Sequence, residues 1–278
     1  MIPVAFDYER ASSVDDAIAK LAGGGKLIAG GHSLVPLMKL RLSEPGRLID
    51  IAKIPGLSGI RENGGAIEIG AITTHHEIAS STLLRDTCPM LAEAAAEIGD
   101  PQVRNRGTIG GSIAHADPAA DLPAVVLALD ADILLKGQNG ARTVKASAFF
   151  RGFYDVDLGA GEMITAVRFA PVRSAAYAKL HQRASHYAVV GVAAALDVKG
   201  GVIQSARLGL TGATTHAVRV KSVEAALAGK KADGVAAACQ SASSDVGDIN
   251  ADLHASADYR KAMIAVFARR AIDKALSR

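Results

Sequence analysis

The stretch "KLIAGGHSLVPLMKLRL" (residues 26–42) places a glycine pair directly after a short apolar run of strand length. Gly30 and Gly31 follow that run, and His32 and Ser33 come directly after them. Glycine lets the main chain turn through positive φ and come close to a ligand. Successive backbone N–H groups in such a turn can hold an anion. The stretch therefore predicts either an ordinary tight turn or an anion-binding loop.

A second stretch, "RGTIGGSIAHADPAADLP" (residues 106–123), repeats the pattern. It places Gly110 and Gly111 beside hydroxyl residues, and His115 follows them as His32 follows the first pair. Two such loops predict two backbone cradles that close from opposite sides on one extended, phosphate-bearing ligand. Asp121, farther along, is suited to accept hydrogen bonds from sugar hydroxyls, and it also suits the start of a helix.

Standard nucleotide motifs do not explain these loops. The chain has no GxxxxGK[ST] sequence, which excludes a P-loop. The stretch "GGGKLIAGG" contains a G-x-G, but it precedes the strand, whereas the dinucleotide fingerprint follows one. The loops therefore match neither of these two motifs.

Composition limits the class of protein. With 278 residues, 49% of them hydrophobic and 21% charged, the chain is expected to fold into two or three globular domains. The net charge of +3 is spread along the chain, and no basic run lies next to aromatic residues. A nucleic-acid partner is therefore not expected.

The N-terminus and the cysteines suggest a cytoplasmic protein. The opening "MIPVAFDYERASSVDD" has early acids and no apolar signal core, and no apolar run reaches the about 18 residues of a membrane span. Cys88 and Cys239 are the only cysteines, which fits a reducing compartment. Two cysteines are too few to ligate an iron–sulfur cluster in the usual way.

Apolar periodicity predicts three parts in an α+β chain. Residues 1–55 form a small α/β unit with a helix capped by Ser13 and ended by Gly23, and residues 56–172 alternate strands with helices. In residues 173–278 three strands, with a hairpin at Gly200–Gly201, precede an amphipathic terminal helix. The apolar face of that helix is predicted to hold Ala262, Ile264, Phe267, Ala271 and Ile272.

The stretches "AGGHSLVPLMKLRL" and "VRNRGTIGGSIAHADPAADLP" closely resemble the FAD-binding medium subunit of the molybdenum-containing hydroxylases. That family includes aerobic carbon monoxide dehydrogenase, xanthine dehydrogenase and related aldehyde or N-heterocycle oxidising enzymes. "LGLTGATTHAVR" (residues 208–219) and "SADYRKAM" (residues 256–263) look like its C-terminal domain, so the resemblance runs from end to end. It implies a three-domain α+β flavoprotein. Its two-part FAD-binding module would be of the vanillyl-alcohol oxidase (PCMH) type, and its C-terminal α+β domain would cover the flavin.

The resemblance also implies the residues of an FAD site. Around the pyrophosphate it places Leu27, Ile28, Ala29, Gly30, Gly31, His32, Ser33 and Leu34. The opposing loop would hold Thr108, Ile109, Gly110, Gly111 and Ser112, with His115 nearby. Asp121 would bind ribityl or ribose hydroxyls, and Ile98 would lie near the adenine in place of an aromatic ring found in some relatives. Lys179 and Tyr187 would face the flavin from the C-terminal domain.

The function implied is electron transfer by an oxidoreductase subunit. Electrons from a molybdenum-pterin site would pass through two [2Fe–2S] clusters to FAD on this chain and then to an external acceptor. A large molybdopterin subunit and a small [2Fe–2S] subunit would be the partners, in a dimer of heterotrimers. No catalytic residue and no metal ligand is expected on this chain.

Two alternatives remain open at this point. A stand-alone flavoprotein oxidoreductase of the same fold would need no partner subunit. A metal-dependent hydrolase would use His115, Asp117 and Asp121, which are suitable ligand types for zinc or manganese. The adjacent pair His75–His76 is expected at a helix start or on the surface, because neighbouring side chains on a helix point apart.

Overall fold

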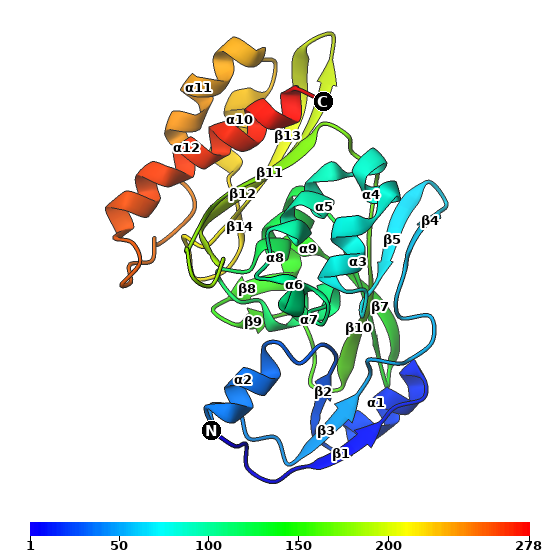
Figure 1. Ribbon diagram of the computed structural model, residues 1–278. Coiled ribbons are helices and arrows are strands. Elements are labelled where there is room, and N and C mark those ends of the chain that lie inside the picture. The colour runs from blue at the N-terminus through cyan, green and yellow to red at the C-terminus, as the bar shows by residue number, and fades with distance from the viewer.

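The computed structural model describes all 278 residues and has three principal sheets with helices packed between and around them (Figure 1). The N-terminal sheet is parallel, in the order β1-β3-β2. Its elements are β1 (Asp7–Arg10), α1 (Val14–Ala22), β2 (Lys26–Ile28), α2 (Leu34–Lys39) and β3 (Arg47–Asp50). The predicted helix stop and start are confirmed: the Ser13 hydroxyl accepts from the Asp16 N–H, and Gly23 is the C-cap.

The middle of the chain is a five-stranded antiparallel sheet in the order β4-β5-β10-β6-β7, with a small β8-β9 ribbon. Its strands are β4 (Ile60–Asn63), β5 (Ala66–Gly70), β6 (Asp132–Gly137), β7 (Gly140–Lys145), β8 (Phe150–Gly152), β9 (Asp155–Val156) and β10 (Glu162–Phe169). Its helices are α3 (His75–Ser80), α4 (Thr82–Thr87), α5 (Pro89–Ala96), α6 (Pro101–Arg104), α7 (Ile109–His115), α8 (Asp121–Ala128) and α9 (Ala146–Phe149).

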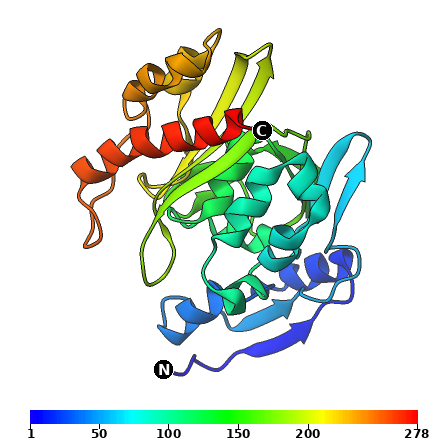
Figure 2. The same ribbon diagram turned by 45° about the horizontal axis from the view of Figure 1, so that its top comes forward.

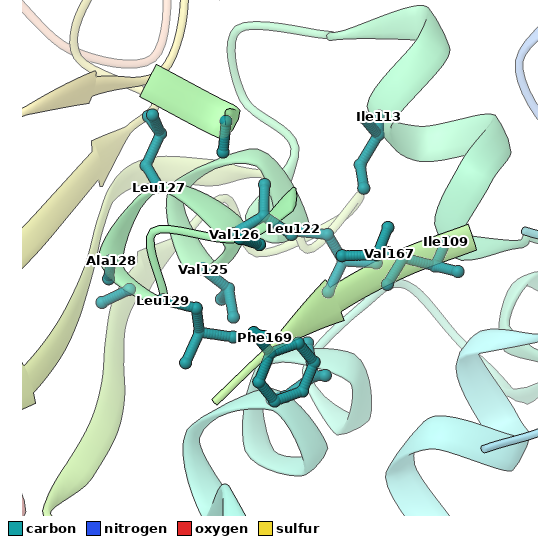
Figure 3. Close-up of a cluster of buried hydrophobic side chains, with 14 of the residues drawn as sticks. Ile109, Ile113, Leu122, Val125, Val126, Leu127, Ala128, Leu129, Val167 and Phe169 are labelled. Carbon is teal, nitrogen blue, oxygen red and sulfur yellow. The ribbon is translucent and has the colours of Figure 1, made fainter. Parts of the chain in front are cut away.

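Helix α8 is the centre of the largest core. All eight of its residues are buried, as expected for a helix that is apolar on every side. Figure 3 shows Leu122, Val125 and Val126 of this helix in one apolar cluster with Val167 and Phe169 of β10. The helix therefore fixes Asp121, at its first turn, deep inside the molecule.

The C-terminal sheet is antiparallel, in the order β11-β12-β13-β14. Its elements are β11 (Ala175–His181), β12 (Ala188–Lys199), β13 (Val202–Thr211), β14 (Val218–Arg219), α10 (Lys221–Leu227), α11 (Val235–Ala238) and α12 (Ala257–Leu276), with short 3₁₀ turns at Ala232–Gly234 and Cys239–Ser241. Helix α12, red in Figure 2, lies across this sheet.

Strand β12 is buried on both faces, and this burial explains why its sequence is a continuous apolar run. Ala193 and Ala195 belong to the core around α8, whereas Val192 and Ala194 belong to the core under α12. A strand buried on both faces loses the alternation of apolar and polar residues. The sheet thus joins the C-terminal part to the middle of the molecule.

The α+β class and the three C-terminal strands are confirmed, whereas the division at residues 55 and 172 stays a prediction. On α12 the predicted apolar face is confirmed for Ile264, Phe267, Ala271 and Ile272, which are buried. Ala262 was wrongly included, because it is exposed and lies off the stripe that packs on the sheet. No helix has the length and apolar character needed to cross a bilayer.

Arg260 is a buried cation that holds the start of α12 against the sheet. Its Nη1 donates to the carbonyl oxygens of Val189 at 2.7 Å and Gly212 at 2.6 Å, and its Nη2 donates to Asp252 at 2.6 Å. We expect Arg260→Met to lower the free energy of unfolding by about 2 kcal/mol, since hydrogen bonds to charged groups are lost. Urea denaturation measures the change.

The control is Arg269→Met on the same helix. Arg269 pairs only with Asp273 at the exposed surface, so we expect a loss below about 0.5 kcal/mol. Equal losses in the two variants would show that the buried hydrogen bonds of Arg260 do not stabilise this end of the helix.

Candidate functional site

A cavity of about 930 Å³ lies where all three parts of the chain meet. It is lined by the 25–40 segment, by helices and loops of the middle part, and by residues 185–187 of the β11–β12 connection. Its volume is in the range of cavities that hold a cofactor or an extended ligand, roughly 300–1,000 Å³. It is therefore the candidate site.

Most of the predicted site residues line this cavity. They are Leu27, Ile28, Ala29, Gly30, Gly31, His32, Ser33, Leu34, Ile98, Thr108, Gly110, Gly111, Ser112, His115, Asp121 and Tyr187. Ile109 and Lys179 do not line it, because Ile109 is buried in the central core and Lys179 is buried behind Asp121. The structure thus brings these segments together, while their contacts with a ligand stay a prediction.

The first glycine loop joins β2 to α2. Gly31 has φ +75°, a conformation that favours glycine, and a Cβ on Gly30 would lie 2.0 Å from the carbonyl oxygen of Arg106. Gly30 therefore brings this loop into backbone contact with the second glycine stretch. His32 Nδ1 lies 3.0 Å from the carbonyl oxygen of Gly30, which holds the ring on its own loop.

The backbone N–H groups of the first loop are free. None of the N–H groups of residues 29–34 donates a hydrogen bond within the chain, and this segment lines the cavity. Consecutive backbone N–H groups without a partner in a turn can form an anion site. The first loop is thus built to receive an anionic group from the cavity.

The second glycine stretch differs from the prediction. Residues 109–115 form helix α7, capped by Thr108, and not an open loop. Its first four N–H groups are already bonded: those of residues 109, 110, 111 and 112 donate to Thr73 O, Ala71 O, Thr108 Oγ1 and Thr108 O. The N–H groups at the start of α7 are therefore occupied within the chain, while contact of this stretch with a ligand stays a prediction. The side chain of Ser112 belongs to the cavity lining.

Packing, more than ligand contact, explains the glycine at position 110. A Cβ on Gly110 would lie 2.7 Å from the carbonyl oxygen of Ala71. The start of α7 can therefore approach the end of β5 only if this residue has no side chain. A glycine pair in a sequence does not distinguish this close approach from an anion-binding turn.

Asp121 forms a buried ion pair at the cavity wall. Its carboxylate accepts from the Tyr177 hydroxyl at 2.5 Å and from Lys179 Nζ at 3.0 Å. Burial raises the pKa of the Asp121 carboxyl, and Lys179 and then Tyr177 act in the opposite direction. A Cβ on Gly191 would lie 2.2 Å from the Tyr177 hydroxyl, so the glycine leaves room for it.

Lys179 links three segments of the chain and does not line the cavity, so its predicted position facing the ligand stays without support from the structure. Its Nζ donates to the carbonyl oxygens of Glu97 at 2.9 Å and His186 at 2.8 Å, in addition to Asp121. An ammonium has three N–H donors, so none remains for the cavity. The link holds the end of α5, the start of α8 and the loop that carries Tyr187. Tyr187 itself lines the cavity and is 46% exposed.

Tyr154 is a cavity residue that the sequence did not reveal. It lies in the β8–β9 turn at φ +53°, its hydroxyl donates to Asp117 at 3.1 Å, and its ring centre lies 4.9 Å from that of His115. Burial and then Asp117 raise the pKa of Tyr154 to about 12. Burial also lowers the pKa of His115. The adjacent aromatic pair Phe153–Tyr154 in a turn was the signal available in the sequence.

His75 was also missed. The predicted helix start at this pair is confirmed, since Thr74 and Glu77 form a capping box and α3 begins at His75. His76 is exposed as expected, but His75 is buried and lines the cavity. Its burial depends on the second glycine stretch, which lies far away in the sequence.

The hypothesis of a hydrolytic metal site is wrong. No three of the histidine, cysteine, aspartate and glutamate side chains gather closely enough to hold a metal ion. Asp121 is paired with Lys179, and Asp117 accepts from the Ala119 N–H at 2.8 Å and from Tyr154. Asp121 and Asp117 are therefore engaged by partners within the chain, and His115 lies against the ring of Tyr154.

Two family models together cover nearly the whole chain. "FAD binding domain in molybdopterin dehydrogenase" matches residues 4–171. "CO dehydrogenase flavoprotein C-terminal domain" matches residues 175–275. The residues that line the cavity thus all fall within the regions matched by the two family models.

Individual relatives are similar over their full length. The carbon monoxide dehydrogenase medium chain of Hydrogenophaga pseudoflava is 41% identical, with 100% of this chain and 99% of the relative covered. A solved carbon monoxide dehydrogenase from the same organism has a TM-score of 0.95 at 42% identity, with 100% and 99% of the two chains covered. Quinoline 2-oxidoreductase from Pseudomonas putida 86 has a TM-score of 0.93 at 32% identity, with the same coverage.

Proposed function

The chain belongs to the FAD-binding medium subunits of the molybdenum hydroxylase family, and on that premise we propose that it carries electrons from partner iron–sulfur clusters through FAD to an external acceptor. It is an oxidoreductase subunit whose two-part FAD-binding module and C-terminal domain were predicted from the sequence. The observation that carries the proposal is the single cavity shared by the first glycine loop, Asp121 and Tyr187.

The residues present fit FAD. The free N–H groups of residues 29–34 match a pyrophosphate, and Gly30 has no room for a side chain beside Arg106. The same cavity is also lined by Ile98 and by Tyr187. A dinucleotide with two ring systems and a central anion has a group to offer to each of these parts of the wall.

Each part of the cavity wall has its own role in holding the cofactor. The first loop binds the pyrophosphate, Ile98 contacts the adenine, and Tyr187 contacts the flavin ring. Asp121 accepts from ribityl or ribose hydroxyls, since a carboxylate keeps acceptor sites beyond those used by Tyr177 and Lys179. When bound, FAD supplies redox chemistry that no side chain of this protein can perform. The protein holds the cofactor, orients it and limits its contact with water.

Partner subunits are part of the proposal. Cys88 and Cys239 are both buried, far apart in the sequence and in different cores, so iron–sulfur clusters would come from a small [2Fe–2S] subunit. A large molybdopterin subunit would select the substrate, in a dimer of heterotrimers. Solved relatives named for carbon monoxide and for quinoline have nearly the same fold as this chain, which supports the proposal that substrate choice lies elsewhere in the complex.

Anaerobic electron transfer tests the proposal. The FAD-loaded chain is mixed with chemically reduced small subunit, and flavin absorbance is followed by stopped flow. We expect the flavin to be reduced by the cluster-containing subunit and to stay oxidised with a cluster-free preparation of the same subunit. A chain that oxidises carbon monoxide, xanthine or quinoline by itself would instead establish a stand-alone flavoprotein.

A further inference from the structure

His75 is held between the two glycine stretches. Its backbone N–H donates to the carbonyl oxygen of Gly107 at 2.9 Å, and Thr74 forms a β-bridge with Thr108. The ring lies against Gly107, where a Cβ would be 2.7 Å from ring atoms Cδ2 and Nε2. The imidazole is thus fixed at the point where the loops meet.

The ring is polar, buried and without a protein partner. His75 is 5% exposed, lines the cavity, and its Nδ1 has no hydrogen-bond partner. Leaving a buried polar atom unsatisfied costs about 1–3 kcal/mol. Nδ1 itself is enclosed, and Nε2 makes no hydrogen bond within the chain either, so neither ring nitrogen of this cavity-lining residue has a protein partner.

The surroundings of the ring favour an anion. The ionisable groups that face it are His32, from the first glycine loop, and Arg104, from α6, and no carboxylate is among them. On its own helix, Glu77 is bonded to Thr74, and His76 is exposed. Burial first, and then His32 and Arg104, lower the pKa of His75 to about 4. An anion placed beside the ring would act in the opposite direction.

We propose that His75 is a further ligand of the cofactor phosphates and that its imidazole takes up a proton from solvent when the pyrophosphate enters the cavity. The inference rests on the proposed function. The free N–H groups of residues 29–34 and the imidazolium of His75 then hold one anion from two sides.

Calorimetry measures the proton directly. FAD is titrated into the flavin-free chain at pH 6 in two buffers of different ionisation enthalpy, which gives the number of protons bound per FAD. Because an adjacent anion raises a buried histidine pKa by about 1–3 units, we expect uptake of roughly half a proton. Affinity should rise as the pH falls from 8 to 5.5, since the bound form has the higher pKa. This gain is lost as the pH rises through the pKa of the bound form.

Substitutions of individual histidines test which residue takes up the proton. His75→Asn and His75→Gln keep a polar side chain but cannot titrate, so proton uptake should fall to about zero in both. His76→Asn, the exposed neighbour, should leave uptake unchanged, whereas His32→Gln can change its extent, because His32 acts on the pKa of His75, but should not abolish it. Circular dichroism checks that each variant is folded.

Three results would overturn the inference. FAD binding by the wild-type chain without proton uptake would exclude it and leave the proposed function intact. If His32→Gln lost proton uptake and both His75 variants kept it, the proton would belong to His32 in the first glycine loop. Absence of any FAD binding by the wild-type chain would overturn this inference and the proposed function together.

Discussion

Gly30→Ala is expected to yield a folded chain that binds FAD at least about 100-fold more weakly. The added methyl group would lie 2.0 Å from the carbonyl oxygen of Arg106 and 2.7 Å from its carbonyl carbon, so the first loop must move away from the second stretch. Overpacking against a rigid neighbour costs about 1–3 kcal/mol or more, and about 1.4 kcal/mol is tenfold in affinity. Quenching of flavin fluorescence measures the dissociation constant.

The matched control is Gly46→Ala, in the same N-terminal part. Gly46 has no atom within 4 Å of a built Cβ, and its φ lies outside the positive region. Its affinity for FAD should equal that of the wild type. Similar FAD affinity in Gly30→Ala and wild type would show that contact between the two loops does not form the anion site.

Lys179→Met is expected to lower the free energy of unfolding by about 3–5 kcal/mol at neutral pH. Removing the ammonium leaves the Asp121 carboxylate buried without its cation, and breaking one side of a buried pair has this cost. Two carbonyl oxygens, of Glu97 and His186, also lose their donor. Urea denaturation followed by circular dichroism measures the change.

The loss of unfolding free energy in Lys179→Met should become larger as the pH rises. The pKa of Asp121 is already raised by burial, and Lys179 is the largest influence that lowers it. With the lysine gone the folded-state pKa rises further, so the folded chain holds this proton more readily than the unfolded chain. The destabilisation should be smallest at low pH and should grow as the pH rises through the folded-state pKa.

A double variant separates the charge from the packing. Lys179→Met with Asp121→Asn removes both charges while keeping similar volumes, and replacing a buried pair by neutral groups is often nearly neutral. We expect it to recover at least about half of the lost free energy. A double variant less stable than Lys179→Met alone would show that the ion pair is not the source of the stability.

The sequence predicted those elements whose signals are local. Helix α1 follows from Ser13 and Gly23, which are its observed caps, and α3 begins next to the Thr74 cap. The long apolar run of β12 indicated burial, although it did not reveal that α8 and α12 cover opposite faces. Local signals were sufficient here because tertiary packing agrees with them.

The site was predicted less completely, because its details depend on distant contacts. Whether Gly110 and Gly111 form a loop or a helix is decided by packing on Ala71, 39 positions before Gly110. The neutralisation of Asp121 comes from Lys179 in another part of the chain, and the burial of His75 comes from Gly107. No periodicity or local motif records such pairs, so the sequence indicated the right cavity but not which groups in it are free.

Direct quantification of flavin tests whether this cavity holds one FAD. The chain is purified alone and with its partner subunits, the chromophore is released by acid, and FAD is measured per chain by chromatography. We expect about one FAD per chain in the complex and in the isolated chain after reconstitution, and much less in Gly30→Ala under the same conditions. A wild-type chain without flavin in every preparation would contradict this expectation.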